Sequence, residues 1–532
     1  MAKNNTYMNS TQIKSYNIPW PTNEDIPLIA SSPLPANFME YVHNFYNQYP
    51  DKVIQEVNVA LKTIEECGCT AVSAGGTFEQ MDAIVRATRI ASKGIDLNLN
   101  VILSPEYLNQ SPSTTLKILT HYGATKNLNN GEYTPFINQD KIVAWLIMNQ
   151  PHFWDWGDTL ALQDNNGTDY VWNRLTTGYG IARYLDHYYK TGQTPTSSSP
   201  KRLSFFNLAA VPDKTSTSGN AIRDFLGSCS TYKEYLDVLD KLFEPKVWCY
   251  NYFPFFNILN PNDNITGTSL NLDEFFRYLI LFRNKINNPR VREINPIFWN
   301  YAMTIEHKYV NASGITEWHR PAPTVGMLRL QVFCTLAFGA KGIVYYMYGS
   351  QRTNVTSDGR IIYGKAPLDC EISGSGLNSV ITFKKTEIWD AIKTVNLEVK
   401  SWREIFVKSK VVTCFTMGRS INGIVSFPNK YICINSLQTG SKGVIISHRV
   451  IVPENNKPTS KTQHYFVLVN LDYENEQTIE ISFKDGYDAK FIEPSLSALP
   501  EDYKSTLPTV SGESVYHRTL SSGGIAVITF YT

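Results

Sequence analysis

The sequence predicts a (β/α)₈ barrel of the TIM type, followed by an all-β sandwich. Up to about residue 406, short apolar runs alternate with segments of helical spacing, and this alternation occurs eight times. Strands that alternate with helices form parallel sheets, and eight such units close into a barrel. Beyond about residue 408 the helical spacing ends and short alternating runs take over, as in β-sandwiches.

The eight expected barrel strands are short apolar runs that end at turn-forming residues. They lie at 26–32, 70–74, 97–103, 142–148, 202–208, 246–250, 296–303 and 342–348. Helical spacing is found at 36–66, 81–90, 220–243, 274–284, 323–338 and 385–406. A doubly wound open sheet is the alternative fold, but Gly75-Gly76 does not match the G-x-G-x-x-G phosphate turn that such sheets usually need.

A chain of 532 residues is too long for one ordinary core, so more than one domain is expected. We predict an irregular lead-in at 1–24, the barrel domain at 25–407 and the β-sandwich domain at 408–532. Since barrels of this type carry their chemistry where their strands end, the functional site is expected in the middle segment.

Composition favours a neutral ligand that stacks on rings. Lys and Arg total 49 against 48 for Asp and Glu, so no basic face indicates nucleic acid. Aromatic residues make up 13% of the chain, which suits an oligosaccharide or polysaccharide. The eight cysteines include one close pair, Cys67 and Cys69, and nothing stands at zinc-ligand spacing from it. We therefore predict no metal, no other cofactor and no disulfide framework.

The N-terminus is polar and contains no signal-like apolar core. No run of about twenty apolar residues occurs, so no membrane-spanning helix is expected. These patterns leave both the compartment and the oligomeric state open, because a removed signal peptide would leave the same sequence.

The segment 141–158 is the most informative stretch of the chain. Its apolar run ends abruptly at Asn149-Gln150-Pro151, and Trp154, Asp155 and Asp158 follow soon after. Rings beside amides and carboxylates suit a sugar, because ring faces stack on it and polar tips fix its hydroxyls. The alternative is an ordinary core strand that leads into a surface loop.

Other expected strands also end in polar or aromatic residues, namely Glu106, Asn207, Asn251, Tyr252, Asn300, Glu306, His307 and Tyr348. Hydrolysis of a glycosidic bond with retention needs two carboxyls about 5–5.5 Å apart, whereas inversion needs roughly 6.5–9.5 Å. An amide can hold a hydroxyl, but it can be neither the general acid nor the nucleophile.

Several segments together carry a resemblance to a known group, over roughly residues 27–530. They read AWLIMNQP, RLSFFNLAAV, KVWCYNYFPF, PIFWNYAMTIEH, PAPTVGMLRLQVFCTLAFGAKGIVYYMYG, YGKAPLD, WDAIKTVNLEV and, at the end, RTLSSGGIAVITFY. The chain resembles glycoside hydrolases built on a (β/α)₈ barrel with a C-terminal β domain, the clan that includes β-galactosidase-like enzymes. Within this clan, the chain looks similar to uncharacterised bacterial glycosidases of glycan-degrading systems. The resemblance implies an exported protein of a glycan-using bacterium.

The resemblance also implies roles for individual positions. In the family, the fourth strand ends in Asn-Glu-Pro or Asp-Glu-Pro, and this Glu is the acid/base; here Gln150 stands in its place. Related chains often have Asp where this one has Asn251. The nucleophile is a Glu at the end of the seventh strand, for which Glu306 is the nearest match, several residues beyond the apolar core of that strand.

Gln150 has three interpretations. In the first, the chain has lost hydrolysis and keeps sugar binding. In the second, Gln150 is an engineered replacement of Glu. In the third, another acid, such as Asp155, Asp158, Glu106 or Glu317, takes over the role of the acid/base. We predict a glycoside hydrolase-like protein that retains configuration if it is active, with a non-hydrolytic glycan-binding protein as the alternative and a structural scaffold as a third class. The predicted catalytic positions are Glu306 and Gln150, and the predicted ligand-binding residues are Asn149, Trp154, Asn207, Asn251, Tyr252, Trp299, His307, Tyr348 and Glu106.

Overall fold

The computed structural model describes most of the chain between residues 25 and 532. The described residues are 25–105, 124–126, 133–135, 139–149, 203–215, 226–243, 245–260, 264–288, 296–356, 358–451, 462–492 and 515–532. Within these ranges, no helix is both long and apolar enough to cross a membrane.

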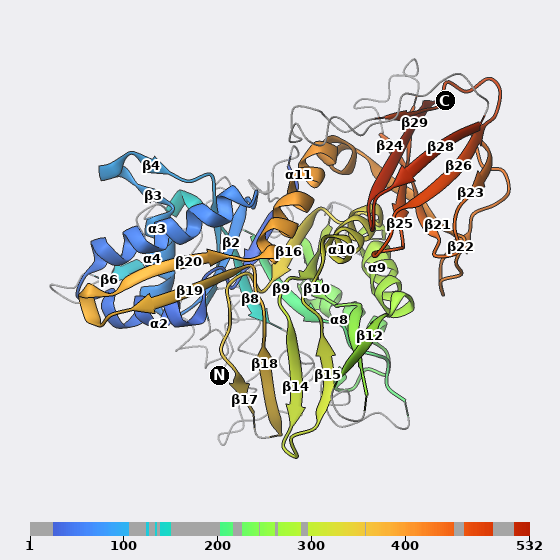
Figure 1. Ribbon diagram of the computed structural model, residues 1–532. Helices are drawn as coiled ribbons and strands as arrows, with labels where there is room; N and C mark the ends of the chain where they lie inside the picture. The colour runs from blue at the N-terminus through green and yellow to red at the C-terminus, as the bar shows by residue number, and fades with distance from the viewer. Residues whose placement is uncertain are drawn as a thin grey trace, which may run out of the picture.

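Eight parallel strands close into a barrel, which confirms the predicted fold class (Figure 1). In chain order they are β1 (Leu28–Ser31), β2 (Ala71–Gly76), β5 (Asn100–Pro105), β8 (Ile142–Asn149), β9 (Leu203–Ala209), β10 (Val247–Asn251), β13 (Ile297–Met303) and β16 (Gly342–Tyr346). Neighbours in the chain are neighbours in the barrel, and β16 closes the ring on β1 with Leu28 opposite Ile343. Each predicted strand corresponds to one of these, because an apolar run covered on both faces is typical of a parallel strand.

Helices cover the outside of the barrel, and some of them begin at side-chain caps. They are α2 (Ala36–Phe45), α3 (Pro50–Glu66), α4 (Phe78–Ala87), α8 (Tyr232–Phe243), α9 (Leu272–Asn287), α10 (Val325–Ala337) and α11 (Glu387–Lys408). Thr77 and Gln80 form a reciprocal capping box at α4, and Thr324 caps α10. The single helix expected at 36–66 is two helices, because Pro50 starts α3 at a position where its missing N–H costs nothing.

Hairpins extend from the carboxyl ends of barrel strands, and sequence periodicity did not predict them. They comprise β11 (Phe255–Leu259) with β12 (Ile265–Leu270), the sheet of β14 (His307–Asn311), β15 (Thr316–Arg320), β17 (Asn354–Val355) and β18 (Gly359–Tyr363), and β19 (Leu368–Ser373) with β20 (Val380–Lys385). Two-stranded pairs are formed by β3 (Arg89–Ile90) with β4 (Ile95–Asp96) and by β6 (Ala124–Lys126) with β7 (Tyr133–Pro135). Figure 1 shows β14, β15 and β18 projecting below the barrel.

Two antiparallel sheets make up the C-terminal region. The larger contains β21 (Lys410–Met417), β22 (Val425–Ser426), β24 (Val444–Ile451), β25 (Gln463–Asn470), β27 (Lys490–Ile492) and β29 (Ile525–Tyr531), and the smaller contains β23 (Ile434–Gln438), β26 (Gln477–Phe483) and β28 (Val515–Leu520). Ile446, Phe466 and Ile479 belong to one apolar core that both sheets share. The predicted change to β structure near residue 408 is confirmed, whereas a separate sandwich domain at 408–532 stays a prediction.

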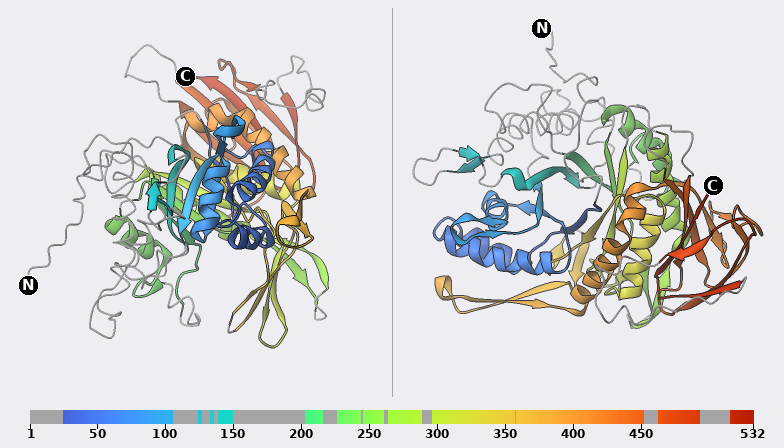
Figure 2. Two further views of the ribbon diagram at one scale, coloured as in Figure 1. Left: turned by 90° about the vertical axis from the view of Figure 1, so that its left-hand side faces the viewer. Right: turned by 90° about the horizontal axis from the view of Figure 1, so that it is seen from above.

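The larger C-terminal sheet has a second buried face. Alternate residues such as Ile445, Val467 and Val469 belong to the main core together with the barrel helices. In Figure 2 the red C-terminal strands accordingly lie beside the orange and yellow helices. Helix α10 is therefore covered on every side, which explains why nearly all of its residues are buried and why its sequence shows no polar stripe.

Candidate functional site

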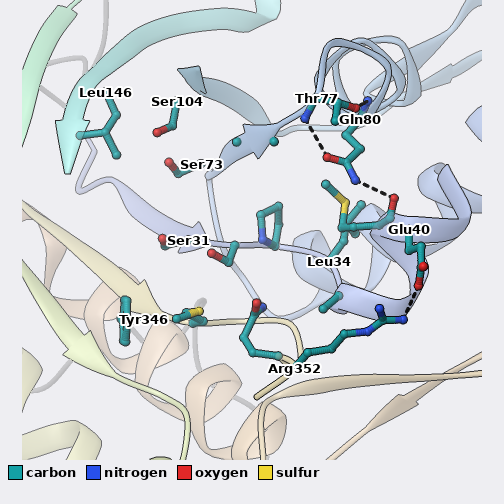
Figure 3. A pocket seen from close by; sticks show the side chains of 18 of the residues that line it. Ser31, Leu34, Glu40, Ser73, Thr77, Gln80, Ser104, Leu146, Tyr346 and Arg352 are labelled. Carbon is teal, nitrogen blue, oxygen red and sulfur yellow. Dashed lines mark hydrogen bonds and ion pairs between the residues drawn. The ribbon is translucent and has the colours of Figure 1, made fainter. Parts of the chain in front are cut away.

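A cavity of about 720 Å³ opens at the mouth of the barrel, where the strands end (Figure 3). Seven of the eight barrel strands contribute to its lining; among the described residues β10 does not. Ser31, Ser73 and Ser104 come from the ends of three neighbouring strands, β1, β2 and β5. Because parallel strands end on one side of the barrel, residues more than 70 positions apart in the chain share this cavity.

The inner wall of this mouth cavity carries no charged side chain among the described residues, and its polar groups stand beside apolar ones such as Leu146. It presents the three serine hydroxyls, the Asn207 amide from β9, and the rings of Tyr301 and Tyr346. Asn207 is buried and stands opposite Asn149 across the β8–β9 pair. Hydroxyl, amide and ring groups suit an uncharged ligand that is rich in hydroxyls.

The rim of the mouth cavity is built by α2, α4 and the segment after β16. Glu40 of α2 forms an ion pair with Arg352, and both side chains are more than half exposed, so the pair adds little stability. Gln80 accepts a hydrogen bond from the Thr77 N–H at 2.8 Å and donates one to the Met39 carbonyl at 2.7 Å. The first bond fixes the Gln80 side chain at the start of α4, and the second joins α4 to α2, so that both shape one wall of the cavity (Figure 3).

Glu306 lies three residues beyond the end of β13, outside the described lining of the mouth cavity. Its Oε1 is 3.0 Å from His319 Nε2, and its Oε2 is 3.4 Å from the backbone N–H of Lys365. The Glu306 N–H and carbonyl also pair with the Lys365 carbonyl and the Gly364 N–H. A side chain at Gly364 would meet the carboxylate, since an added Cβ would lie 2.5 Å from Oε2.

A chain of hydrogen bonds orients His319 toward Glu306. The Thr268 hydroxyl lies 3.2 Å from Asn257 Oδ1, and Asn257 Nδ2 lies 3.2 Å from His319 Nδ1. Because an amide nitrogen only donates, His319 accepts at Nδ1 and keeps its proton at Nε2. That proton points at Glu306, so residues of three strands and one loop act together to hold the carboxylate.

An aromatic cluster around His307, the next residue after Glu306, shares the Tyr346 ring with the wall of the mouth cavity. His307 is buried among the rings of Phe253, Trp318, Tyr346 and Tyr363, at centroid distances between 5.4 and 6.3 Å. Burial lowers the pKa of His307 to about 4, so the ring is neutral near pH 7. Its Nδ1 lies 3.0 Å from the Ile305 carbonyl and donates to it. Tyr346 belongs both to this cluster and to the cavity wall.

Part of the predicted site lies outside the described residues. Glu106, Gln150, Trp154, Asp155 and Asp158 belong to this part. Asn149 is described as the last residue of β8, at the mouth of the barrel.

Other predicted residues lie at the ends of strands but away from the mouth cavity. Asn251 ends β10 opposite Tyr301, and the nitrogen of its side-chain amide is buried. Tyr252 packs on the ring of Tyr278 at 5.2 Å, and burial raises its pKa to about 12. Neither of the two lines the cavity, and Glu317 lies on the hairpin of β15.

Two predicted ligand-binding residues are in the core, which corrects their assignment. Trp299 and Tyr348 have no exposed surface, so neither ring can present a face to a ligand. Trp299 packs edge-on against Phe205 at 5.1 Å and fills the space left by Gly342. Trp299 lies in the packed interior of the barrel, whereas Tyr348 lies beyond the end of β16, beside Cys67 and Trp389.

The serines of the cavity wall and Tyr301 and Tyr346 were missed by the prediction. A usable signal was present, because Ser31, Ser73 and Ser104 each stand at or near the end of an expected strand. Among the described residues no group of three or more His, Cys, Asp or Glu side chains could hold a metal, and the eight cysteines are free and buried.

Comparisons with known proteins give weak matches. No family model and no curated protein matches the sequence. Similar solved structures include an endo-β-1,4-mannanase from Thermotoga petrophila, with 10% identity, 87% of this chain and 95% of that chain covered, and a TM-score of 0.37. An aphid myrosinase has 9% identity, coverage of 71% and 98%, and a TM-score of 0.34. A β-glucosidase from Thermotoga maritima has 10% identity, coverage of 62% and 89%, and a TM-score of 0.29. Since these scores are low, the fold assignment rests on the strand pairing itself.

Proposed function

We propose that this chain is a glycoside-hydrolase-type protein that binds a neutral glycan at the mouth of its barrel. The observation that carries the proposal is the mouth cavity, where hydroxyls, an amide and tyrosine rings from different strands converge. Its volume of about 720 Å³ lies within the range of ordinary small-molecule sites. The predicted ligand, an oligosaccharide or polysaccharide, matches this lining chemistry.

For a hydrolytic form, we propose retention of configuration with Glu306 as the nucleophile. Support comes from its position just beyond the seventh barrel strand and from the N–H groups of His319 and Lys365, which hold its carboxylate in one orientation. The resemblance puts the acid/base at position 150, directly after Asn149 in the chain, where the sequence has Gln. A Gln cannot protonate a leaving group, so turnover requires another acid.

A non-hydrolytic glycan-binding protein is the second candidate, and one observation favours it. Among the described residues that line the mouth cavity, the only carboxylate is Glu40, which is at the rim and paired with Arg352. Retaining hydrolysis needs two carboxyls about 5–5.5 Å apart across the bond that is cleaved. The described wall therefore suits binding better than cleavage.

A panel of aryl glycosides and matching oligosaccharides tests the two candidates together. A hydrolase would turn over at least one glycoside, and Glu306→Gln would lower kcat by roughly a thousandfold or more, as removal of a nucleophile does. Glu404→Gln on the exposed face of α11 is the matched control and should leave kcat unchanged.

A binding protein would instead show saturable oligosaccharide binding without turnover, and Gln150→Glu would not create turnover. If no compound of the panel binds and none is turned over, the proposal is contradicted and a structural scaffold remains. Calorimetry measures binding, and release of the aryl group measures turnover. The two readings are independent.

A further inference from the structure

A second cavity, of about 520 Å³, lies in the groove between β11 and β15. Figure 1 shows the hairpins that carry these strands side by side below the barrel. In the part of the chain that the structure describes, the groove shares no lining residue with the mouth cavity. It is thus a separate place where a ligand could bind.

One part of the groove is aromatic, and its rings contact neighbouring side chains. Phe256 and Trp318 both line it, and the Arg320 guanidinium lies 4.2 Å from the centroid of the first ring and 5.7 Å from that of the second. Trp318 also stacks on Tyr309, with ring centroids 6.0 Å apart and an interplanar angle of 23°. A ring surface that is already ordered loses little conformational entropy when a ligand packs on it.

The rest of the groove is polar. Asn257, Asn260, Thr316 and His319 bring amide, hydroxyl and imidazole groups to the lining, and Glu317 brings its one carboxylate among the described residues. No Lys or Arg belongs to that described lining. Arg320 does not line the groove either, and its Nη1 donates to the carbonyls of Phe253 and Phe255. This charge pattern disfavours phosphate, sulfate and carboxylate ligands.

We propose that this groove is a second saccharide site, for neutral pyranose units of a glycan. A pyranose offers C–H faces for Phe256 and Trp318 and hydroxyls for the amides and for Glu317. The ligand class rests on the proposed function, but the site is distinct from the mouth cavity. His319 also joins the groove to Glu306, because one imidazole nitrogen faces Asn257 in the groove and the other faces the Glu306 carboxylate.

Isothermal titration of the full chain with cellobiose, mannobiose, xylobiose and chitobiose tests the proposal. Wild type should show two saturable sites for at least one disaccharide. Trp318→Leu keeps apolar bulk but removes the ring, so it should weaken the groove site by about three- to tenfold. Ser104→Phe fills the mouth cavity and should remove the other site while leaving the groove site intact.

Val355→Ala on β17 is the control, since Val355 is 75% exposed and lines neither cavity. Circular dichroism and the thermal midpoint establish that each variant is folded. The groove proposal is overturned, and the mouth site retained, if the wild type shows a single site that Ser104→Phe removes and Trp318→Leu leaves unchanged. A single site with the opposite response would support the groove and refute the mouth cavity. Binding of no disaccharide would refute both.

Discussion

At the scale of single residues, the barrel core depends on large side chains that face glycines. Trp299 on β13 is fully buried, and its register partner on β16 is Gly342. An added Cβ at Gly342 would lie 2.7 Å from Trp299 Cδ1, closer than real Cβ contacts allow. The indole therefore occupies this place only because the opposite residue has no side chain.

We predict that Gly342→Ala destabilises the protein by roughly 1–3 kcal/mol, because the rigid Trp299 ring has no room to move in a packed core. Urea denaturation followed by tryptophan fluorescence measures the change in unfolding free energy. Gly267→Ala on β12 is the matched control, since the nearest atom would be at an ordinary 3.8 Å. Equal stability of Gly342→Ala and wild type would show that the barrel core adjusts at this point.

At the scale of elements, the neighbouring strands β24 and β25 bring together two histidines. His448 Nε2 and His464 Nδ1 are 2.9 Å apart, and the two rings stack with centroids 5.2 Å apart. The Tyr431 hydroxyl lies 3.1 Å from His448 Nδ1. Burial is the main cause that lowers the pKa of His448 from 6.5 to about 4, and the charge on His464 is the second cause. The strand pair thus contains an imidazole that resists protonation.

This element is predicted to lose stability in acid. Because the pKa of His448 is lower in the folded state, unfolded chains take up its proton first as the pH falls below 6.5. The stability linked to this group is present above pH 6.5 and is lost as the pH approaches 4. His448→Phe should make that part of the pH profile of unfolding free energy less steep, because buried His307 still contributes there, whereas His517→Phe, at an exposed position, should leave the slope unchanged. Parallel profiles for wild type and His448→Phe would contradict this.

At the scale of the whole molecule, the C-terminal sheet is joined to the barrel helices through a buried cation, Arg449. Arg449 of β24 is fully buried and donates to the carbonyls of Leu336 and Ala337 at the end of α10. It also donates to the carbonyls of Phe406 and Ser409 at the end of α11. Carbonyls at the ends of helices have no partner within the helix, so a cation there is stabilising.

We predict that Arg449→Leu lowers the unfolding free energy by about 3 kcal/mol, since it removes charged hydrogen bonds and leaves unfilled space. Because the residue lies between the C-terminal sheet and the barrel helices, thermal unfolding followed by calorimetry should also become broader or split in two. Lys430→Met, at an exposed position, is the control for loss of a positive charge. A single sharp transition at the wild-type temperature would show that the interface does not depend on Arg449.

The candidate site was only partly predictable, because each of its contacts joins distant segments. Sequence reasoning selected Asn207 and Glu306, but it could not show that His319 and the Lys365 N–H hold the Glu306 carboxylate. These partners stand on a hairpin and a loop that periodicity does not reveal. It also counted Trp299 among the ligand-binding residues, although residue type alone cannot distinguish a ring inside a barrel from one at its mouth.

The sequence by itself determined the architecture: eight apolar runs, the helices between them and the change to β structure near residue 408. Burial on one or two faces leaves a periodic trace in the chain, so this level can be read without coordinates. Only the tertiary structure decided that Ser31, Ser73 and Ser104 share one cavity and that Glu306 faces His319. Such contacts depend on strand register and on where hairpins fold back, and neither leaves a periodic pattern in the sequence.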